Sequence, residues 1–399
     1  MNDLAARLSE SISDWELERR WSAARKVMLE ANADALIVQG ANHIAGVNGY
    51  FQWFTARVVL GSYPETVILP KSGLMTLIGH GPAGADADLA GKDVSARGVG
   101  PRLNTAAFPM ASYTGKLDAE AAANAINKMG ARRVGLVGPN SMYYEFLAAL
   151  KRLAGSVDFV DVSNEVDLLR ARKSDEEIGF LRKTARMQDE IIEGLRSYIR
   201  PGLRDFEIMA YGDYLGKQRG SQTGYFLGSS APPGEPTGMR MHPQHNRVMR
   251  KGDVILVQAE NSGPGGYFVH MCRYFVLGKT PKDLVDAFGK VVEAQGYTAR
   301  LLRPGVAFRD AFADYNGYMR KNGLPEERRL HCHSQGYDVV ERPLARSEEM
   351  MLVENDMNIG IHPSISNERV FATISDNFLT RADGSLERLH KTPQEIFEI

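Results

Sequence analysis

A long helix predicted between residues 174 and 199 most constrains how this chain can fold, because it divides the sequence into two halves. Ser174 can accept hydrogen bonds from the free N–H groups of the first turn, and Glu177 stands three residues later, as in a capping box. Apolar residues continue at helical spacing to Ile199, and Pro201-Gly202 then ends the helix. The two halves are therefore expected to fold around separate cores.

The half before Val166 alternates predicted helices and strands. Helices are expected over 15–33 and 141–153, and strands over 35–38, 66–69, 75–78 and 133–137. This alternation is typical of an α/β layer. A chain of 399 residues is too long for one ordinary core, so we predict an α/β domain over residues 1–165 and an α+β domain over residues 166–399.

Charge and composition exclude several classes of partner. The formal net charge is −1, so neither nucleic acid nor a membrane surface is an expected partner, whereas a small molecule is. Cys272 and Cys332 are too few for a disulfide framework. The polar N-terminal segment lacks the features of a secretory signal, and no apolar run approaches the roughly 20 residues that span a bilayer. We expect a cytoplasmic protein.

A series of motifs in the second half resembles a known family in order and spacing. Gly252-Asp253 opens the apolar run 254–257, Gly266-Tyr267 follows, and Arg273 precedes an aromatic pair. The series resembles the creatinase and aminopeptidase P family (M24, "pita-bread" fold), in which two ligand aspartates occupy the gaps. The segment 376–384 resembles the terminal hairpin of that family. The resemblance implies a creatinase-like N-terminal α/β domain over 1–165 and a pita-bread catalytic domain over 166–399.

The resemblance also assigns five positions to the ligands of a dinuclear metal centre, normally two Asp, one His and two Glu. By spacing, these positions are Gln258, His270, His333, His362 and Ser375 in this chain. None is a carboxylate, and hard divalent ions require carboxylate oxygens. We therefore expect no metal ligands and no cofactor, and we do not expect ordinary proline-specific peptide cleavage.

Three of these positions are histidines, so His270, His333 and His362 should converge. The hypothesis that we carry forward is a metal-free cluster that handles protons and binds substrate, with Gln258 beside it. Two alternatives stay open. The rings could be packed core imidazoles, or they could form a mononuclear site, since three histidines are a known catalytic zinc set.

Two further residues are candidates for proton transfer. The resemblance places a functional His near His242, where creatinase uses it as general acid/base, although His245 is close enough to be the alternative. Imidazole suits this role because it titrates near neutrality. Glu260 stands two residues beyond Gln258 on the same predicted strand, so both side chains should point to one face. We predict His242, His333 and Glu260 as catalytic residues.

The aromatic segment around Arg57 resembles the creatinase segment that reaches into the neighbouring subunit. The resemblance implies that Phe54 and Arg57 hold the carboxylate of a substrate bound by the partner, and that Arg342 is a second carboxylate-binding residue. Arginine suits this role because its planar fork makes two parallel bonds to a carboxylate. We therefore expect a homodimer with shared active sites.

Together, these expectations describe a metal-independent, creatinase-like hydrolase that cleaves a C–N bond in a small carboxylate-bearing substrate. A lyase or a ring-opening hydrolase on the same scaffold is an alternative. A non-catalytic pita-bread binding protein is another, but retained histidines such as His242 favour catalysis over a binding remnant.

Overall fold

The computed structural model describes residues 10–40, 49–59, 63–241, 244 and 246–399. It divides into two compact units, one over 11–170 and the other over 171–399 together with Glu10. The predicted boundary at 165/166 lies inside helix α6 (Ser163–Ala171), whereas the two units divide at the end of this helix, after Arg170. Among the described residues, none of the helices combines the length and apolar character that a membrane span needs.

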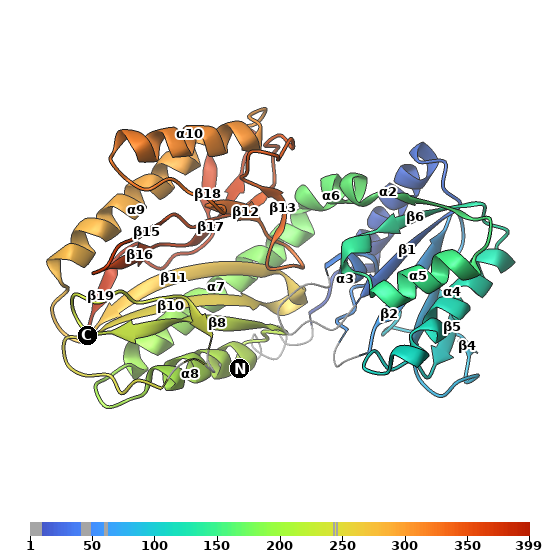
Figure 1. The fold of residues 1–399 in the computed structure, drawn as a ribbon, viewed down its shortest axis with the longest axis horizontal. Helices are drawn as coiled ribbons and strands as arrows, with labels where there is room; N and C mark the ends of the chain where they lie inside the picture. Colours follow the sequence, from blue (N-terminus) through green and yellow to red (C-terminus); the bar gives the residue numbers. More distant parts are fainter. Residues whose placement is uncertain (1–9, 41–48, 60–62, 242–243, 245) are drawn as a thin grey trace. The chain divides into compact units, whose positions relative to one another are not determined.

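The N-terminal unit contains a seven-stranded mixed sheet in the order β4-β5-β3-β2-β1-β6-β7 (Figure 1). Its strands are β1 (Ala35–Gly40), β2 (Glu65–Pro70), β3 (Met75–His80), β4 (Ala87–Asp88), β5 (Val99–Thr105), β6 (Arg133–Val137) and β7 (Asp158–Asp161). Its helices besides α6 are α2 (Asp14–Glu30), α3 (Gly49–Thr55), α4 (Lys116–Lys128) and α5 (Tyr144–Leu153), with short 3₁₀ turns η1 (Ser112–Thr114) and η2 (Pro139–Ser141). The predicted α/β layer is confirmed.

The C-terminal unit begins with helix α7 (Asp175–Tyr198), whose capping box is as predicted. The Ser174 hydroxyl accepts from the Glu177 N–H at 3.3 Å, and the Glu177 carboxylate accepts from the Ser174 N–H at 2.7 Å. These reciprocal bonds satisfy N–H groups that have no partner within the helix. The helix is therefore specified locally by its own sequence.

Two five-stranded sheets form the framework of the C-terminal unit. The first has the order β19-β11-β10-β8-β9 and the second β13-β12-β14-β17-β18. The strands of the first sheet are β8 (Gly224–Ala231), β9 (Arg240–Met241), β10 (Val254–Ser262), β11 (Phe268–Val276) and β19 (Ile396–Glu398). Those of the second are β12 (Cys332–Ser334), β13 (Glu341–Leu344), β14 (Asn358–Ile361), β17 (Asp376–Thr380) and β18 (Leu386–Arg388).

The remaining elements of this unit are three helices, a short 3₁₀ turn and a two-stranded ribbon. They are α8 (Asp205–Gln218), α9 (Lys282–Leu301), α10 (Phe308–Lys321), η4 (Pro264–Gly266), β15 (Ser364–Ser366) and β16 (Phe371–Thr373). Figure 1 shows α7 and α8 on one side of the first sheet, with α9 and α10 toward the second sheet. Apolar side chains pack on both faces of the first sheet, one cluster with α7 and α8 and the other with α9.

Candidate active site

Strand β10 changes from apolar to polar halfway along one face. Ile255 and Val257 pack in the cluster with α7 and α8, and Leu256 packs on the opposite face with α9. Because side chains alternate along a strand, Gln258 and Glu260 continue the Leu256 face. Both are largely buried, with 8% of their surface exposed. The predicted sharing of one face by Gln258 and Glu260 agrees with the hydrogen bond between them.

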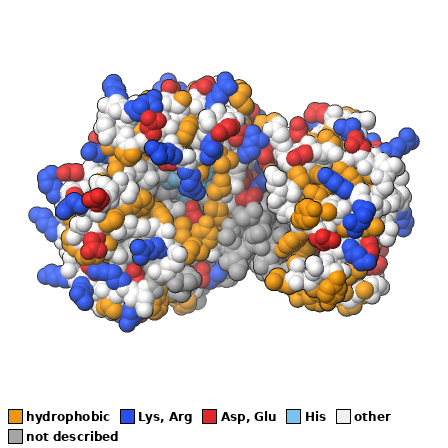
Figure 2. Space-filling view, viewed as in Figure 1, with side chains coloured by type: hydrophobic (Ala, Val, Ile, Leu, Met, Phe, Trp, Pro, Cys, Tyr) orange, Lys and Arg blue, Asp and Glu red, His pale blue; other side chains and the backbone are white. Residues whose placement is uncertain are grey.

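These two side chains line a pocket of about 440 Å³ in the C-terminal unit. The pocket also contains side chains from β8, the segment before β12, β12 itself and the segment after β14. Its lining residues are Tyr225, Leu227, Met239, Gln258, Glu260, Glu327, Arg329, Leu330, His333, Val339, Val340, His362, Ser364, Phe371 and Thr373. Figure 2 shows pale blue histidine atoms in a hollow of this unit, with Lys and Arg side chains beside it. The volume suits a small molecule.

Glu260 is held in place by hydrogen bonds from two neighbours. The Gln258 Nε2 donates to Glu260 Oε1 at 2.8 Å, and the hydroxyl of Tyr225, its register partner on β8, also bonds to this carboxyl group. Burial raises the pKa of Glu260, although both hydrogen bonds and the charge of Arg329 act in the opposite direction. A buried carboxyl group with a raised pKa is suited to general acid/base chemistry.

The three histidines predicted to converge lie at the corners of a triangle. The ring centroids of His270 and His333 are 5.2 Å apart, those of His270 and His362 are 5.3 Å apart, and those of His333 and His362 are 5.1 Å apart. His270 is opposite Glu260 in the register of β10 and β11. Ser375, the fifth predicted position, bonds through its Oγ to His270 Nδ1. The five positions therefore come together in one region.

Burial keeps these imidazoles neutral. It holds the pKa of His270 well below its usual value, and the neighbouring rings of His333 and His362 lower it further. Burial also lowers the pKa of His333 to about 4 and holds the pKa of His362 well below the usual value. Neutral imidazoles can approach one another without the repulsion that converging charges would suffer. Their lone pairs are therefore available as acceptors or ligands.

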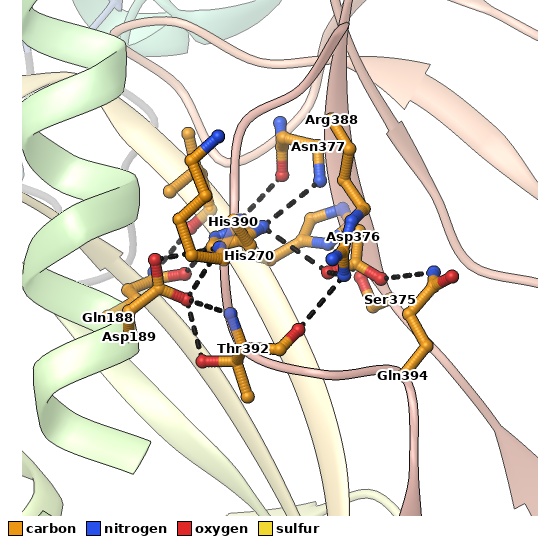
Figure 3. A network of polar contacts seen from close by, with 12 residues as sticks. Gln188, Asp189, His270, Ser375, Asp376, Asn377, Arg388, His390, Thr392 and Gln394 are labelled. Atoms are coloured by element: carbon orange, nitrogen blue, oxygen red, sulfur yellow. Dashed lines mark hydrogen bonds and ion pairs between the residues drawn. The ribbon is translucent and has the colours of Figure 1, made fainter. Parts of the chain in front are cut away.

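A polar network behind the histidines joins helix α7 to the segment after β18 (Figure 3). Gln188 donates from Nε2 to the Val269 carbonyl at 2.7 Å, and its Oε1 is 3.0 Å from His390 Nε2. The amide of Asn377 accepts from the His270 N–H at 2.9 Å. These bonds fix the strand that carries His270.

The residues predicted to serve a partner's pocket lie in the N-terminal unit. Phe54 is fully buried there on α3 and makes an edge-to-face contact with Trp53. Arg57 binds Glu65 through two hydrogen bonds of 2.7 and 3.0 Å. In this chain, therefore, Arg57 already has a carboxylate partner, and Phe54 presents no exposed surface.

Arg342, the second predicted carboxylate-binding residue, is paired within the C-terminal unit. Arg342 makes two bonds to Glu349, of 2.7 and 3.0 Å, and it is not among the residues that line the pocket. His242 and His245 lie outside the described residues. Glu341, the neighbour of Arg342 in the chain, forms an ion pair with Lys173 at 3.0 Å.

Three ionisable pocket residues, Tyr225, Glu327 and Arg329, were not predicted from the sequence. Tyr225 carries a recognisable signal, because a Tyr on a strand that pairs with the strand of Glu260 can reach its carboxyl group. Arg329 and Glu327 stand in the segment before β12, where no periodic pattern marks them. Arg329 is the only Lys or Arg among the lining residues of this pocket, within the part of the chain that the structure describes.

Comparison with known proteins identifies the family of this chain. The family model described as "Metallopeptidase family M24" matches residues 179–382, which is just over half of the chain. A Xaa-Pro dipeptidase from Pyrococcus horikoshii is 23% identical over 266 residues, which covers 64% of this chain and 73% of that protein.

Solved structures share the fold over nearly the whole chain. The structure of a recombinant prolidase from Thermococcus sibiricus aligns with a TM-score of 0.78 and 19% identity, covering 98% of this chain and 100% of that chain. A Xaa-Pro dipeptidase from Bacillus anthracis aligns with a TM-score of 0.75 and 19% identity, covering 96% and 100%. The predicted fold, a creatinase-like N-terminal domain followed by a pita-bread domain, is confirmed. The chain belongs to metallopeptidase family M24.

Proposed function

We propose that this chain is a hydrolase that cleaves a C–N bond in a small carboxylate-bearing substrate within the pocket of the C-terminal unit. The observation that carries the proposal is the position of Glu260. Its carboxyl group lies in the pocket and is oriented by Gln258 and Tyr225. A positioned acid that can protonate the leaving nitrogen is what C–N cleavage requires.

The lining residues supply the other roles. Arg329 offers a guanidinium group that can bind the carboxylate of the substrate through two parallel bonds. His333 presents its ring to the same pocket, while its Nδ1 is held by the Ser334 carbonyl at 2.8 Å. We assign substrate anchoring to Arg329, and we assign to His333 a place beside the scissile group.

The five residues at the predicted ligand positions do not fit a dinuclear centre of hard divalent ions. They offer three imidazoles, one amide and one hydroxyl, whereas such a centre needs carboxylates that bridge two ions. The nearby carboxylate Asp376 is committed to a buried ion pair with Arg273 at 2.7 Å. We therefore propose no step through a two-metal centre.

Dipeptides are the first substrate class to test. Several relatives, including those from Pyrococcus horikoshii and Bacillus anthracis, are named Xaa-Pro dipeptidases, and a dipeptide carries both an amide C–N bond and a carboxylate. A non-peptide C–N bond, as in the creatinase-like reaction expected from the sequence, is the second candidate. It is favoured by the absence of carboxylates from the five positions.

We further propose that the protein is a homodimer in which Arg57 of one subunit serves the partner's pocket. This proposal rests on the resemblance of the aromatic segment on α3 to that of creatinase. Because Arg57 is bound to Glu65 in the structure, its release is part of the proposal. Sedimentation velocity should give a dimer, whereas a fully active monomer would contradict it.

The function can be tested with a substrate panel. Purified protein is incubated with Xaa-Pro and other dipeptides and with N-acyl and N-carbamoyl amino acids, and release of the free amine is followed by mass spectrometry. Glu260→Gln should lose about 10² to 10⁴-fold in turnover while its melting temperature is retained. Cleavage of none of these compounds, or full activity of Glu260→Gln, would sink the proposal.

A further inference from the structure

We infer that His270, His333 and His362 bind a single divalent transition-metal ion, best matched by Zn²⁺, at the inner end of the pocket. One ligand nitrogen from each ring lies within 4.8 Å of the other two. Tetrahedral zinc at about 2.0–2.1 Å from each nitrogen needs pairs separated by about 3.3 Å. The rings must therefore rotate for their nitrogens to approach to this distance when the ion binds.

The hydrogen bonds of the rings leave the required nitrogens available. His333 uses Nδ1 to bond the Ser334 carbonyl at 2.8 Å, and His270 uses Nδ1 to bond Ser375. Such bonds from the second ring nitrogen are typical of metal-binding histidines, because they fix the tautomer and the ring orientation. In both rings, Nε2 therefore remains as the ligand atom.

Two ring nitrogens of the histidine cluster have no hydrogen-bond partner among the described residues. They are the buried Nε2 atoms of His270 and His362. Leaving a buried polar atom unpaired costs free energy, so native proteins rarely do so without reason. Unpaired ring nitrogens within this cluster are explained if an ion shared by the three rings supplies the missing partner.

The backbone leaves space beside the His270 ring. Gly360 stands opposite His333 in the register of β12 and β14. A Cβ atom at residue 360 would lie 2.3 Å from His270 Nε2, which is closer than real Cβ atoms approach. The glycine thus leaves room for His270 Nε2 beside β14, next to the strand that carries His333.

The ligand set selects the kind of ion and its role. Neutral imidazoles suit zinc and similar borderline ions, whereas magnesium, calcium and manganese prefer oxygen ligands. Three histidines leave a fourth position open, as in catalytic zinc sites, and here His333 and His362 face the pocket that contains Glu260. The catalytic meaning of the site rests on the proposed function, whereas metal binding can be measured without a substrate. A single ion held by three histidines differs from the carboxylate-rich dinuclear centre that the family resemblance implies.

The test uses the full-length chain with its purification tag removed. The protein is stripped with chelator and titrated with ZnCl₂ by calorimetry, with elemental analysis after dialysis and with Co²⁺ as a spectroscopic probe of tetrahedral geometry. One equivalent should bind and raise the melting temperature. His333→Gln and His362→Gln should each weaken binding by at least about 100-fold, and Ser375→Ala by about 10-fold.

Two histidines outside the triangle serve as matched controls. His331→Gln removes a buried ring that stacks on Tyr315, and His80→Gln removes a ring in the N-terminal unit; neither should change the affinity. No saturable binding to the wild type, or unchanged binding by His333→Gln and His362→Gln, overturns the site. One bound equivalent in a protein that hydrolyses none of the test substrates supports the site and contradicts the proposed function.

Discussion

Arg273 and Asp376 form an ion pair of 2.7 Å in which neither side chain has any exposed surface. The pair ties strand β11 to strand β17 next to Ser375, the residue that bonds to His270. Arg273 also donates to the Cys272 carbonyl at 2.7 Å, and Gln394 donates to the second oxygen of Asp376 at 2.9 Å. The pair therefore helps to hold strand β11, which carries His270, against the start of β17.

Removing one partner of this pair should strongly destabilise the protein. Asp376→Asn leaves the Arg273 charge buried without a counter-charge, which typically costs about 3–5 kcal/mol. The measurement is the free energy of unfolding in urea. Arg388→Gln is the control, because Arg388 lies 3.6 Å from the same carboxylate but is 29% exposed, and its loss should cost less than about 1 kcal/mol. Equal costs for the two variants would contradict this account.

His390 should make stability depend on pH on the acid side of neutrality. Burial lowers the pKa of His390 to about 4, and the charges of Arg273 and Arg388 act in the same direction. The charges of Asp376 and Asp189 act in the opposite direction. An unfolded histidine has a pKa of about 6.5, so the unfolded state binds more protons in the window between these values. The contribution of neutral His390 to the free energy of unfolding is therefore complete above about pH 6.5, and it is lost as the pH falls toward about 4.

At pH 5 the His390 contribution should be smaller than at pH 7 by about 2 kcal/mol. Other buried histidines act in the same direction, since burial lowers the pKa of His331 to about 3. The difference between wild type and His390→Gln isolates the single group. Urea unfolding at pH 7 and pH 5 should show a shallower pH dependence for His390→Gln, and an identical dependence would refute the assignment.

Much of the architecture could be predicted because it is encoded locally. The capping box at Ser174 specifies the start of α7 from four consecutive residues, and strand alternation places Gln258 and Glu260 on one face. The convergence of His270 with the other two histidines followed from the family resemblance, and the structure agrees. The capping box and the strand alternation need no knowledge of tertiary packing, whereas the convergence of the histidines depends on the fold that the resemblance implies.

The sequence could not predict which arginine enters the pocket. Arg342 fell near a carboxylate-binding position of the family, but in the structure Glu349 holds it through two bonds. Arg329 lines the pocket instead, and it stands in an irregular segment where side-chain direction depends on the whole fold. Glu260 and Tyr225 likewise meet only because β8 pairs with β10.

The two arginines give contrasting kinetic predictions. Arg329→Gln should raise KM for a carboxylate-bearing substrate by about 10-fold or more with little change in kcat, because it removes an anchor used in both ground and transition states. Arg342→Gln should instead lower the melting temperature, since it leaves Glu349 largely buried without its partner. Steady-state kinetics and thermal melting separate the two roles. If KM rises in Arg342→Gln but not in Arg329→Gln, Arg342 has the carboxylate-binding role that is expected from the sequence.

Gly360 provides a test of the space between the histidines. On β14, its missing side chain leaves room for His270, and a Cβ atom there would lie 2.3 Å from His270 Nε2. Gly360→Ala must therefore displace the ring or the strand, because a packed interior transmits even one added methyl group. Destabilisation of about 1–3 kcal/mol is typical of such overpacking.

The matched control for Gly360→Ala is Gly289→Ala, on an exposed face of helix α9. A Cβ atom at residue 289 meets nothing within 4 Å, so this change should be neutral or stabilise the helix by up to about 1 kcal/mol. Urea unfolding measures both variants, and zinc calorimetry of the folded Gly360→Ala protein measures the histidine geometry. If the displaced element is the His270 ring, zinc affinity falls together with stability. If Gly360→Ala is as stable as wild type and binds zinc equally well, the close approach of Gly360 to His270 is wrong.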